Sequence, residues 1–298
     1  MTKTDLMGGR TLPEDLRDLG VAVGQQPTTL NRARTVISGH PGTGKSTLIH
    51  GNPKAFILDI EGGGRTVVNP QPVRWPDWET IKTPPTFEDY RRIIRQLIDR
   101  KVAGKLQSVE TIGIDTFDAL LELWKRGACK EHGIENINDY RGGYGKGYDL
   151  GCETLFGLLD EVHRAGLGWC VLIHVIDRTV KVGNSDVVMS SLAIPEKFQG
   201  YLSRACEHMF FTDHATETVQ LTKTVDLGGK KMEVPSGTET RSIRRLLCAP
   251  GHTLRGTRAD DVKVRVPMIP EFVLPPKGAW GKLEEEYNAA VTRMIEGT

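Results

Sequence analysis

One octapeptide, residues 39–46 with the sequence GHPGTGKS, constrains the fold of this chain more than any other feature. It matches the spacing G-x-x-x-x-G-K-S/T, in which glycines let backbone N–H groups turn toward phosphate oxygens that a side chain would keep away. Residues 33–38 precede it and are expected to form a short strand, and residues 46–50 are expected to begin a helix. This order of strand, loop and helix predicts a phosphate-binding loop (P-loop) rather than a chance glycine turn.

Two side chains of this loop are expected to make specific contacts with a nucleoside triphosphate. Lys45 is predicted to reach the β- and γ-phosphates and to act in catalysis. Ser46 is predicted to offer its hydroxyl group to Mg²⁺, so the expected cofactors are ATP and Mg²⁺. The predicted nucleotide-binding residues are Gly39, Pro41, Gly42, Thr43, Gly44, Lys45, Ser46 and Thr47.

The rest of the chain alternates between buried strands and amphipathic helices, which predicts a mostly parallel central sheet flanked by helices. After residue 206 the pattern changes to shorter strands with hairpin signals, which predicts an antiparallel C-terminal extension. The expected elements are strands at 55–60, 109–116 and 169–175 and helices at 86–102, 117–129, 148–165 and 282–295. The expected organisation is a poorly ordered N-terminal arm at 1–32, an ATPase core at 33–260, and an extension with a closing helix at 261–298.

Carboxylates follow two of the predicted strands. Asp115 ends an apolar strand, and in P-loop enzymes such an aspartate holds Mg²⁺, usually through water. Asp59 and Glu61 end the strand after the P-loop helix, and the alternation of side chains along a strand predicts that they point the same way. Glu61 is the predicted catalytic base that orients and deprotonates the attacking water. The alternative for each is an acidic residue in a solvated turn.

His174 is predicted to end the strand of residues 169–175. A polar side chain at that place could hydrogen-bond the γ-phosphate and transmit its loss to the following loop, so His174 is a predicted catalytic residue. The alternative is a half-buried histidine with satisfied hydrogen bonds at the edge of the sheet.

Two loops combine basic and aromatic side chains in a way that suits single-stranded nucleic acid. The loop from Tyr140 to Tyr148 carries Arg141, Lys146 and three tyrosines. The segment 177–191 carries Arg178 and Lys181, and it also follows a strand at its carboxyl end, where ligands of open α/β sheets gather. Ordinary surface loops are the alternative.

Late basic residues offer candidates for an arginine that reaches the γ-phosphate of a neighbouring subunit. A solvated basic face is the alternative for each of them. The candidates are Arg241, Arg244, Arg245, Arg255 and Arg258.

Composition narrows the class of protein further. The net charge of +1 means that nucleic-acid binding would depend on local basic loops and not on a global field. The five cysteines form no C-x-x-C pair, which is typical of reduced intracellular cysteine, and no apolar run is long enough to span a bilayer. A cytoplasmic protein without a membrane partner is therefore expected.

The order of these motifs resembles the RecA-like AAA-family ATPases carried by bacteriophages, in particular the single-strand annealing recombinases related to RecA. The resemblance covers about residues 33–260. It implies a RecA-like P-loop core with Glu61 as the catalytic carboxylate and Asp115 beside Mg²⁺. It also implies a homo-oligomeric ring or filament with ATP between subunits, and DNA-binding loops after residues 133 and 176. RecA itself has a glutamine where His174 stands.

The predicted function is therefore a DNA-dependent ATPase that acts on single-stranded DNA in recombination or annealing. Its expected partners are single-stranded DNA, further copies of itself and a phage single-strand binding protein. One alternative is a P-loop kinase of a small molecule or nucleotide, which would need a basic lid over the phosphates. The other is a nucleotide-gated loader or assembly protein that hydrolyses ATP slowly.

Overall fold

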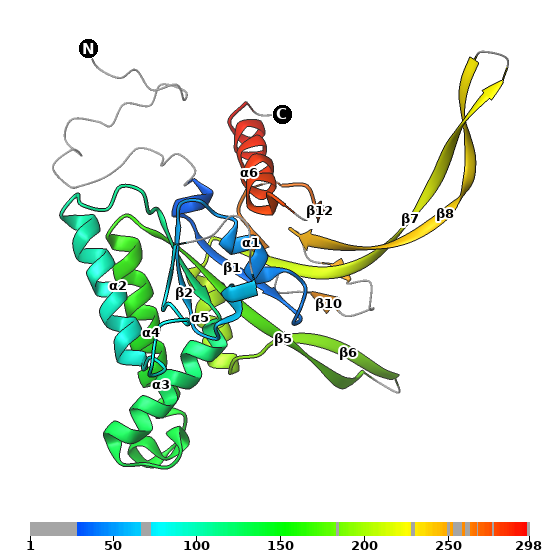
Figure 1. The fold of residues 1–298 in the computed structure, drawn as a ribbon. Helices are drawn as coiled ribbons and strands as arrows, with labels where there is room; N and C mark the ends of the chain where they lie inside the picture. The colour runs from blue at the N-terminus through cyan, green and yellow to red at the C-terminus, as the bar shows by residue number, and fades with distance from the viewer. Residues whose placement is uncertain are drawn as a thin grey trace.

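The structure is a computed structural model that describes residues 29–66, 73–182, 185–227, 230–248, 251–252, 258–259, 263–266, 268–275 and 277–296 (Figure 1). The predictions for the first 28 residues and for Arg255 lie outside these ranges. No helix in the described part of the chain is long and apolar enough to cross a membrane.

A single central sheet organises the chain, and the predicted fold class is confirmed. Its main path runs β3-β2-β4-β5-β1-β7-β8-β12. The first six strands of this path pair in parallel, and β8 and β12 add the antiparallel extension. These strands are β1 (Arg34–Gly39), β2 (Ala55–Asp59), β3 (Val73–Trp75), β4 (Thr111–Asp115), β5 (Gly168–Val182), β7 (His208–Leu227), β8 (Lys230–Leu247) and β12 (Glu271–Leu274).

The order of the strands places the predicted site residues along one edge. β5 lies between β1, which leads into the P-loop, and β4, which ends at Asp115. The register aligns Gly39 with His174 and Asp59 with Asp115. Because parallel strands end at the same edge, four separate stretches of chain meet beside the P-loop.

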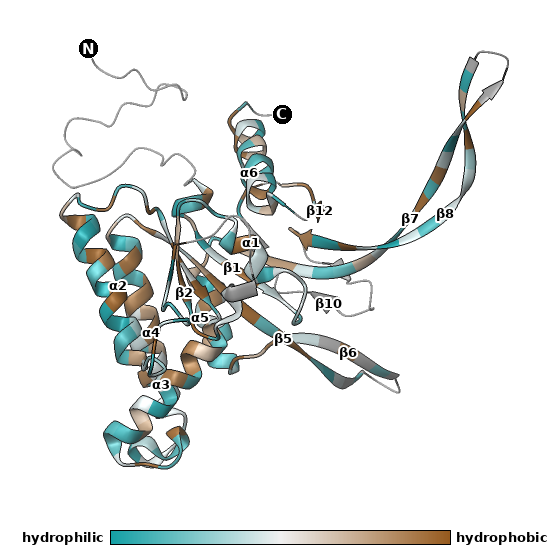
Figure 2. Cartoon of the chain, viewed as in Figure 1, coloured by the Kyte–Doolittle hydropathy of each residue, from teal (hydrophilic) through white to brown (hydrophobic). Residues whose placement is uncertain are grey.

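Helices cover both faces of the sheet, and the alternation of side chains along each strand supplies both faces with apolar groups. Val36 packs into the core under the larger group of helices, whereas its neighbour Ile37 packs into the core on the opposite face. Figure 2 shows the matching alternation of apolar and polar residues along α2 and α4. The larger group is α2 (Phe87–Val102), α3 (Phe117–His132), α4 (Lys146–Arg164) and α5 (Glu196–Ala205), and the opposite face carries α1 (Lys45–His50) and α6 (Ala279–Glu296).

Local sequence signals set the ends of the helices. Thr86 caps α2, since its hydroxyl accepts a hydrogen bond from the backbone N–H of Asp89 and the Asp89 carboxylate accepts one from the backbone of Thr86. This capping box is the one that the sequence predicts. The hydroxyl of Thr116 caps α3 by accepting a hydrogen bond from the backbone N–H of Ala119, and α3 is followed by Gly133, whose φ of 63° suits glycine.

Two pairs of antiparallel strands are longer than the sequence predicts. β5 continues past residue 175 to Val182 and forms an antiparallel hairpin with β6 (Ser185–Leu192), so the prediction that this strand ends at His174 was wrong. The shorter strands expected after residue 206 are also wrong in length, because residues 208–227 form one continuous strand, β7, whose partner β8 is of similar length. Both hairpins project from the body of the molecule (Figure 1). Periodicity could not reveal this, because two exposed faces leave no apolar pattern.

The remaining elements are short. They are the 3₁₀ turns η2 (Leu30–Arg32), η3 (Gly63–Thr66) and η4 (Ile137–Gly142) and the strands β9 (Gly251–His252), β10 (Arg258–Ala259) and β11 (Lys263–Val264).

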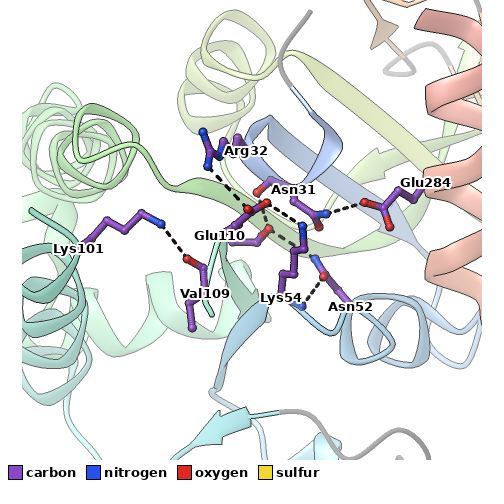
Figure 3. A network of polar contacts seen from close by, with 9 residues as sticks. Asn31, Arg32, Asn52, Lys54, Lys101, Val109, Glu110 and Glu284 are labelled. Atoms are coloured by element: carbon purple, nitrogen blue, oxygen red, sulfur yellow. Dashed lines mark hydrogen bonds and ion pairs between the residues drawn. The ribbon is translucent and has the colours of Figure 1, made fainter. Parts of the chain in front are cut away.

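Residues that precede β1 and residues of the last helix, α6, both pack against the core. Leu30 and Asn31 are buried, so the described end of the predicted arm belongs to the folded body. The Asn31 amide donates to Glu284 of α6 at 2.7 Å, and the hydroxyl of Thr111 donates to the backbone oxygen of Asn31 at 2.5 Å. Figure 3 shows this network, in which Glu110 pairs with Arg32 and Lys54 beside it. The closing helix is thereby tied to the start of β1.

Candidate active site

The P-loop occupies the turn between β1 and α1, as its sequence predicts. Gly42 and Gly44 have φ values of 81° and 93°, a backbone conformation that glycine adopts without strain. A Cβ atom on Gly39 would lie 2.2 Å from the Thr212 hydroxyl oxygen, so β7 passes too close to β1 for any larger residue. The glycines therefore serve both the shape of the loop and its packing against the sheet.

Lys45 is 5% exposed and points back into the loop. Its Nζ donates to the backbone oxygens of Gly39 at 2.8 Å and His40 at 2.9 Å. Burial lowers the pKa of Lys45 to about 8, although nearby carboxylates, with Asp115 the strongest, oppose that shift. The ammonium group is thus held at the phosphate-binding loop in a place where it lacks full solvation.

Asp115 and Asp59 lie side by side at the ends of β4 and β2, and both are buried. The Asp115 carboxylate contacts Nε2 of His50 at 3.1 Å, and Asp59 accepts a hydrogen bond from the backbone N–H of Gly64 at 3.1 Å. Burial, followed by the charge of Asp115, raises the pKa of Asp59. Two adjacent buried carboxylates favour a nearby cation.

The predicted Mg²⁺ ligands fit this arrangement. Ser46 lies one helical turn before His50 on α1, so both side chains share the face of α1 that meets Asp115. The donors are hard oxygen atoms beside a pair of buried carboxylates, which is the chemistry that Mg²⁺ prefers. Ser46 and Asp115 would hold the ion, and the ion would neutralise charge on the phosphates.

Glu61, Asp118 and His174 form a second polar cluster, with ligand atoms within 4.8 Å of one another. His174 Nδ1 lies 2.9 Å from Asp118 Oδ2, and the His174 backbone N–H donates to Asp118 Oδ1 at 3.2 Å. Glu61 is exposed at the mouth of this cluster. An exposed carboxylate beside a fixed carboxylate–imidazole pair has the groups that proton transfer to or from water requires.

The charges within this cluster shift one another. The hydrogen bond that Asp118 accepts from the imidazole raises the pKa of His174, although burial opposes this shift. Burial would raise the pKa of Asp118, but its hydrogen bonds with His174 outweigh burial and lower it. Burial raises the pKa of Glu61, which His174 partly offsets. A carboxylate with a raised pKa is a stronger base, so Glu61 is better suited to accept a proton from water.

The prediction that Asp59 and Glu61 point the same way was wrong. β2 ends at Asp59, and the chain then turns through Gly62, Gly63 and Gly64. Asp59 therefore stays buried beside Asp115, whereas Glu61 reaches the cluster with His174. Strict alternation applies only within a strand, and Glu61 lies beyond it.

The sequence of residues 31–240 matches the profile of the AAA domain family. This chain belongs to the AAA domain family. The crystal structure of the RadB recombinase is among the similar solved structures, with 15% sequence identity and a TM-score of 0.36. The match covers 72% of this chain and 87% of that chain. No curated protein matches at a significant level.

Family membership agrees with the P-loop geometry and supports nucleotide binding by this AAA-domain protein. Asp118 is the functional candidate that sequence reasoning missed. It stands in the first turn of α3, three residues after Asp115, and this spacing at the sheet edge was the available signal. Its partner His174 lies far along the chain, so only the strand order reveals the pair.

Strands β7 and β8 of the AAA-domain protein also contact the P-loop. Thr212 and Thr43 share a hydrogen bond between their hydroxyl oxygens at 2.7 Å. Nε2 of His214 lies 3.1 Å from the backbone oxygen of Gly42. The side chain of Arg244 lies over Gly44. The antiparallel extension is therefore part of the nucleotide site and not a separate appendage.

The structure places the two predicted basic loops differently. The segment 177–191 is not a loop but part of the β5–β6 hairpin, which approaches the P-loop at Asp177, and the end of the loop 140–148 is the first turn of α4. Tyr140 is buried, and the centroids of the Tyr148 and Phe198 rings are 6.3 Å apart. The three tyrosines are therefore not equally available to a ligand. Tyr144 is 99% exposed. Arg178 and Lys181 are exposed on β5, a few residues beyond His174.

Proposed function

We propose that this AAA-domain protein hydrolyses ATP and acts on single-stranded DNA in phage recombination or annealing, as a homo-oligomer. The observation that carries the ATPase proposal is the position of Glu61. Its carboxylate lies with Asp118 and His174 at the sheet edge that holds Lys45 and Asp115. Glu61 orients and deprotonates water, Lys45 binds the phosphates, and Asp115 and Ser46 hold Mg²⁺.

The β5–β6 hairpin offers a path from the nucleotide to DNA. His174 belongs to β5, and the strand runs on without a break to the basic residues Arg178 and Lys181. His40 of the P-loop also approaches Asp177 on β5, with Nε2 and Oδ1 3.3 Å apart. A change in the phosphates can therefore move the base of this hairpin from two sides.

Exposed groups of both predicted basic segments suit single-stranded DNA. The loop around Tyr144 presents a free aromatic face between Arg141 and Lys146, and the hairpin adds two more cations. Base stacking on an aromatic ring together with cations along the backbone binds single strands without reading their sequence. Replacing Tyr144 by Ala is expected to weaken the effect of DNA on turnover.

The first experiment measures ATP turnover with and without single-stranded DNA, using Lys45→Ala as the blank. DNA is expected to stimulate turnover in the wild type and not in the blank. If ATP turnover is the same with and without DNA, the recombinase proposal is overturned. That result would favour a kinase with a small acceptor or a slow nucleotide-gated loader. A phage single-strand binding protein can then be added as a competing or cooperating partner.

Glu61→Gln separates binding from chemistry. The variant keeps the size of the side chain but cannot accept a proton, so ATP binding is expected to persist while turnover falls roughly 100-fold or more. Glu131→Gln, on the exposed end of α3, is the matched control and is expected to behave as wild type. Unchanged turnover in Glu61→Gln would remove Glu61 from the role of base.

A further inference from the structure

Arg244 on β8 lies against the P-loop of its own chain. A Cβ atom built on Gly44 would be 2.7 Å from Nη1 of Arg244 and 3.0 Å from its Cδ. The side chain thus crosses the glycine directly before Lys45, and it is half-buried there. Within the described part of the chain, no carboxylate lies within ion-pair distance of this guanidinium group.

The other late arginines are placed differently. Arg241 pairs with Glu239 on the surface at 2.7 Å. Arg245 pairs with Glu271 at 2.9 Å and approaches Asp213 at 3.6 Å. Arg255 is outside the described residues, and only the backbone of Arg258 is described, in β10. Of the arginines whose side chains are described in this group, Arg244 is the one that combines contact with the P-loop and an uncommitted charge.

The register of the hairpin explains this placement. Arg244 pairs with His214 across β7 and β8, and both side chains therefore lie on the face that meets the P-loop. His214 contacts the backbone oxygen of Gly42 at 3.1 Å. Arg245 pairs with Asp213 and points to the opposite face. The base of the hairpin thus holds Arg244 over Gly44 from within the same chain.

We infer that Arg244 binds the phosphates of the nucleoside triphosphate held by the P-loop of its own chain. This inference rests on the proposed function of the P-loop and names a further residue of that site. A guanidinium group stays charged at all working pH values and presents a planar fork of donors that matches phosphate oxygens. Arg244 therefore acts in cis, whereas the sequence suggested an arginine supplied by a neighbouring subunit.

The direct test is nucleotide affinity, measured with a fluorescent ATP analogue on the full chain. Arg244→Ala is expected to weaken ATP binding roughly ten- to hundredfold, as for the loss of a charged hydrogen bond. Arg244→Lys is expected to recover part of this affinity, because it keeps the charge and loses the fork. Arg241→Ala, on the same strand, is the matched control and is expected to bind as wild type.

ATP affinity within twofold of wild type in Arg244→Ala would overturn the inference, provided that Lys45→Ala loses binding in the same assay. Thermal unfolding of each variant checks that Arg244→Ala is folded, and Arg244→Lys supplies the test if it is not. Binding needs neither turnover nor DNA. A wild type that binds ATP but does not hydrolyse it would therefore defeat the proposed function and leave this inference standing.

A mixing experiment tests whether Arg244 acts in cis. Arg244→Ala and Lys45→Ala chains are mixed at equal concentrations and ATP turnover is measured. If Arg244 serves its own P-loop, neither chain carries a complete site and the mixture is expected to show only the sum of the separate activities. Turnover well above that sum would mean that Arg244 of one chain completes the P-loop of another, and the cis assignment would be wrong.

Discussion

At the scale of single residues, the site is defined by charges held in places where water cannot fully solvate them. Lys45 is nearly buried and bonded to carbonyl oxygens of its own loop. Asp118 and His174 lie within hydrogen-bond distance on the other side of the same edge, and each shifts the pKa of the other toward its charged form. Each of these features has a pH dependence whose direction follows from the shifted pKa.

ATP affinity is expected to fall at high pH because of Lys45. Its pKa is about 8 in the free protein, and bound phosphate favours the ammonium form and raises that pKa. Below pH 8 the proton is already present, so affinity changes little. Above pH 8, Lys45 must take up a proton when ATP binds, and the affinity for ATP is expected to fall by up to about tenfold per pH unit. Dissociation constants measured from pH 7 to 9.5 test this.

The control for this experiment is Lys45→Arg, whose guanidinium stays charged throughout the range. Its ATP affinity, at whatever level it is retained, is expected to be independent of pH. A wild-type dissociation constant that stays flat to pH 9.5 would contradict the lowered pKa of Lys45.

Asp118→Asn is expected to destabilise the fold more in mild acid than in mild base. The folded pKa of His174 is raised, so its contribution is complete below the unfolded pKa and is lost as pH rises through the folded value. The folded pKa of Asp118 is lowered, so its contribution is lost as pH falls through that value. The pair therefore stabilises most between about pH 4 and 6.5.

Urea unfolding at pH 5.5 and pH 8 measures this difference. Loss of the charged hydrogen bond is expected to cost about 1–3 kcal/mol at pH 5.5 and less at pH 8. The imidazole resonances of His174 are expected to titrate at lower pH in the variant. An equal or larger loss of stability at pH 8 would contradict the charged pairing.

At the scale of secondary-structure elements, α6 supports the helix that follows the P-loop. Trp280 is 1% exposed and lies beside Gly51 at the end of α1, with a distance of 3.5 Å between its Cβ and a Cβ built on that glycine. Leu48 and Ile49 of α1 belong to the same apolar cluster as Trp280. The C-terminal helix thus packs against the helix that follows the P-loop.

Trp280→Ala is expected to lower the free energy of unfolding by about 3–5 kcal/mol, because it leaves a large cavity between α6 and α1. Trp280→Phe is expected to cost much less, since the ring still fills most of the space and a buried indole N–H that has no partner among the described residues is removed. Chemical denaturation measures both. Met294→Ala, at a position 45% exposed on the same helix, is the control and is expected to change stability by less than about 0.5 kcal/mol. If Trp280→Ala lowers the free energy of unfolding no more than Met294→Ala does, α6 does not support α1.

At the scale of the whole molecule, two hairpins extend from a body that is otherwise well packed (Figure 1). The β7–β8 hairpin is ordered by its own ladder beyond Thr216, and most of its described side chains there are exposed. Leu221 and Met232 are 37% and 50% exposed on this arm. A two-stranded ribbon with apolar side chains in water gains stability when another surface covers it.

Shortening the β7–β8 hairpin is expected to prevent self-association and to preserve ATP binding. Residues 217–241 are replaced by a two-residue turn that joins Thr216 to Ser242, a pair in the natural register. The matched control shortens the β5–β6 hairpin by joining Thr179 to Val188. Sedimentation velocity is expected to show monomers for the first variant and wild-type assemblies for the second. A first variant that still assembles, or a wild type that is monomeric, would contradict a homo-oligomer built through this arm.

The local sequence was sufficient to predict the P-loop, the buried strands, the α2 capping box and the placement of Asp115 at the end of β4. Each of these depends on residues within a few positions of one another, where turn chemistry and side-chain periodicity act directly. The mostly parallel sheet was predicted from the alternation of strands and helices along the chain. The roles predicted for Lys45, Ser46, Glu61 and Asp115 stay predictions, although the structure brings their elements to one edge.

Only the tertiary structure decided the contacts between distant parts of the chain. Insertion of β5 between β1 and β4 brings His174 to Asp118, and the register of β7 and β8 brings Arg244 to Gly44. Strand order and register are set by the packing of the whole core and not by any local pattern. A one-residue slip in β8 would turn Arg244 away from the P-loop and Arg245 toward it, and no feature of the sequence around them distinguishes the two.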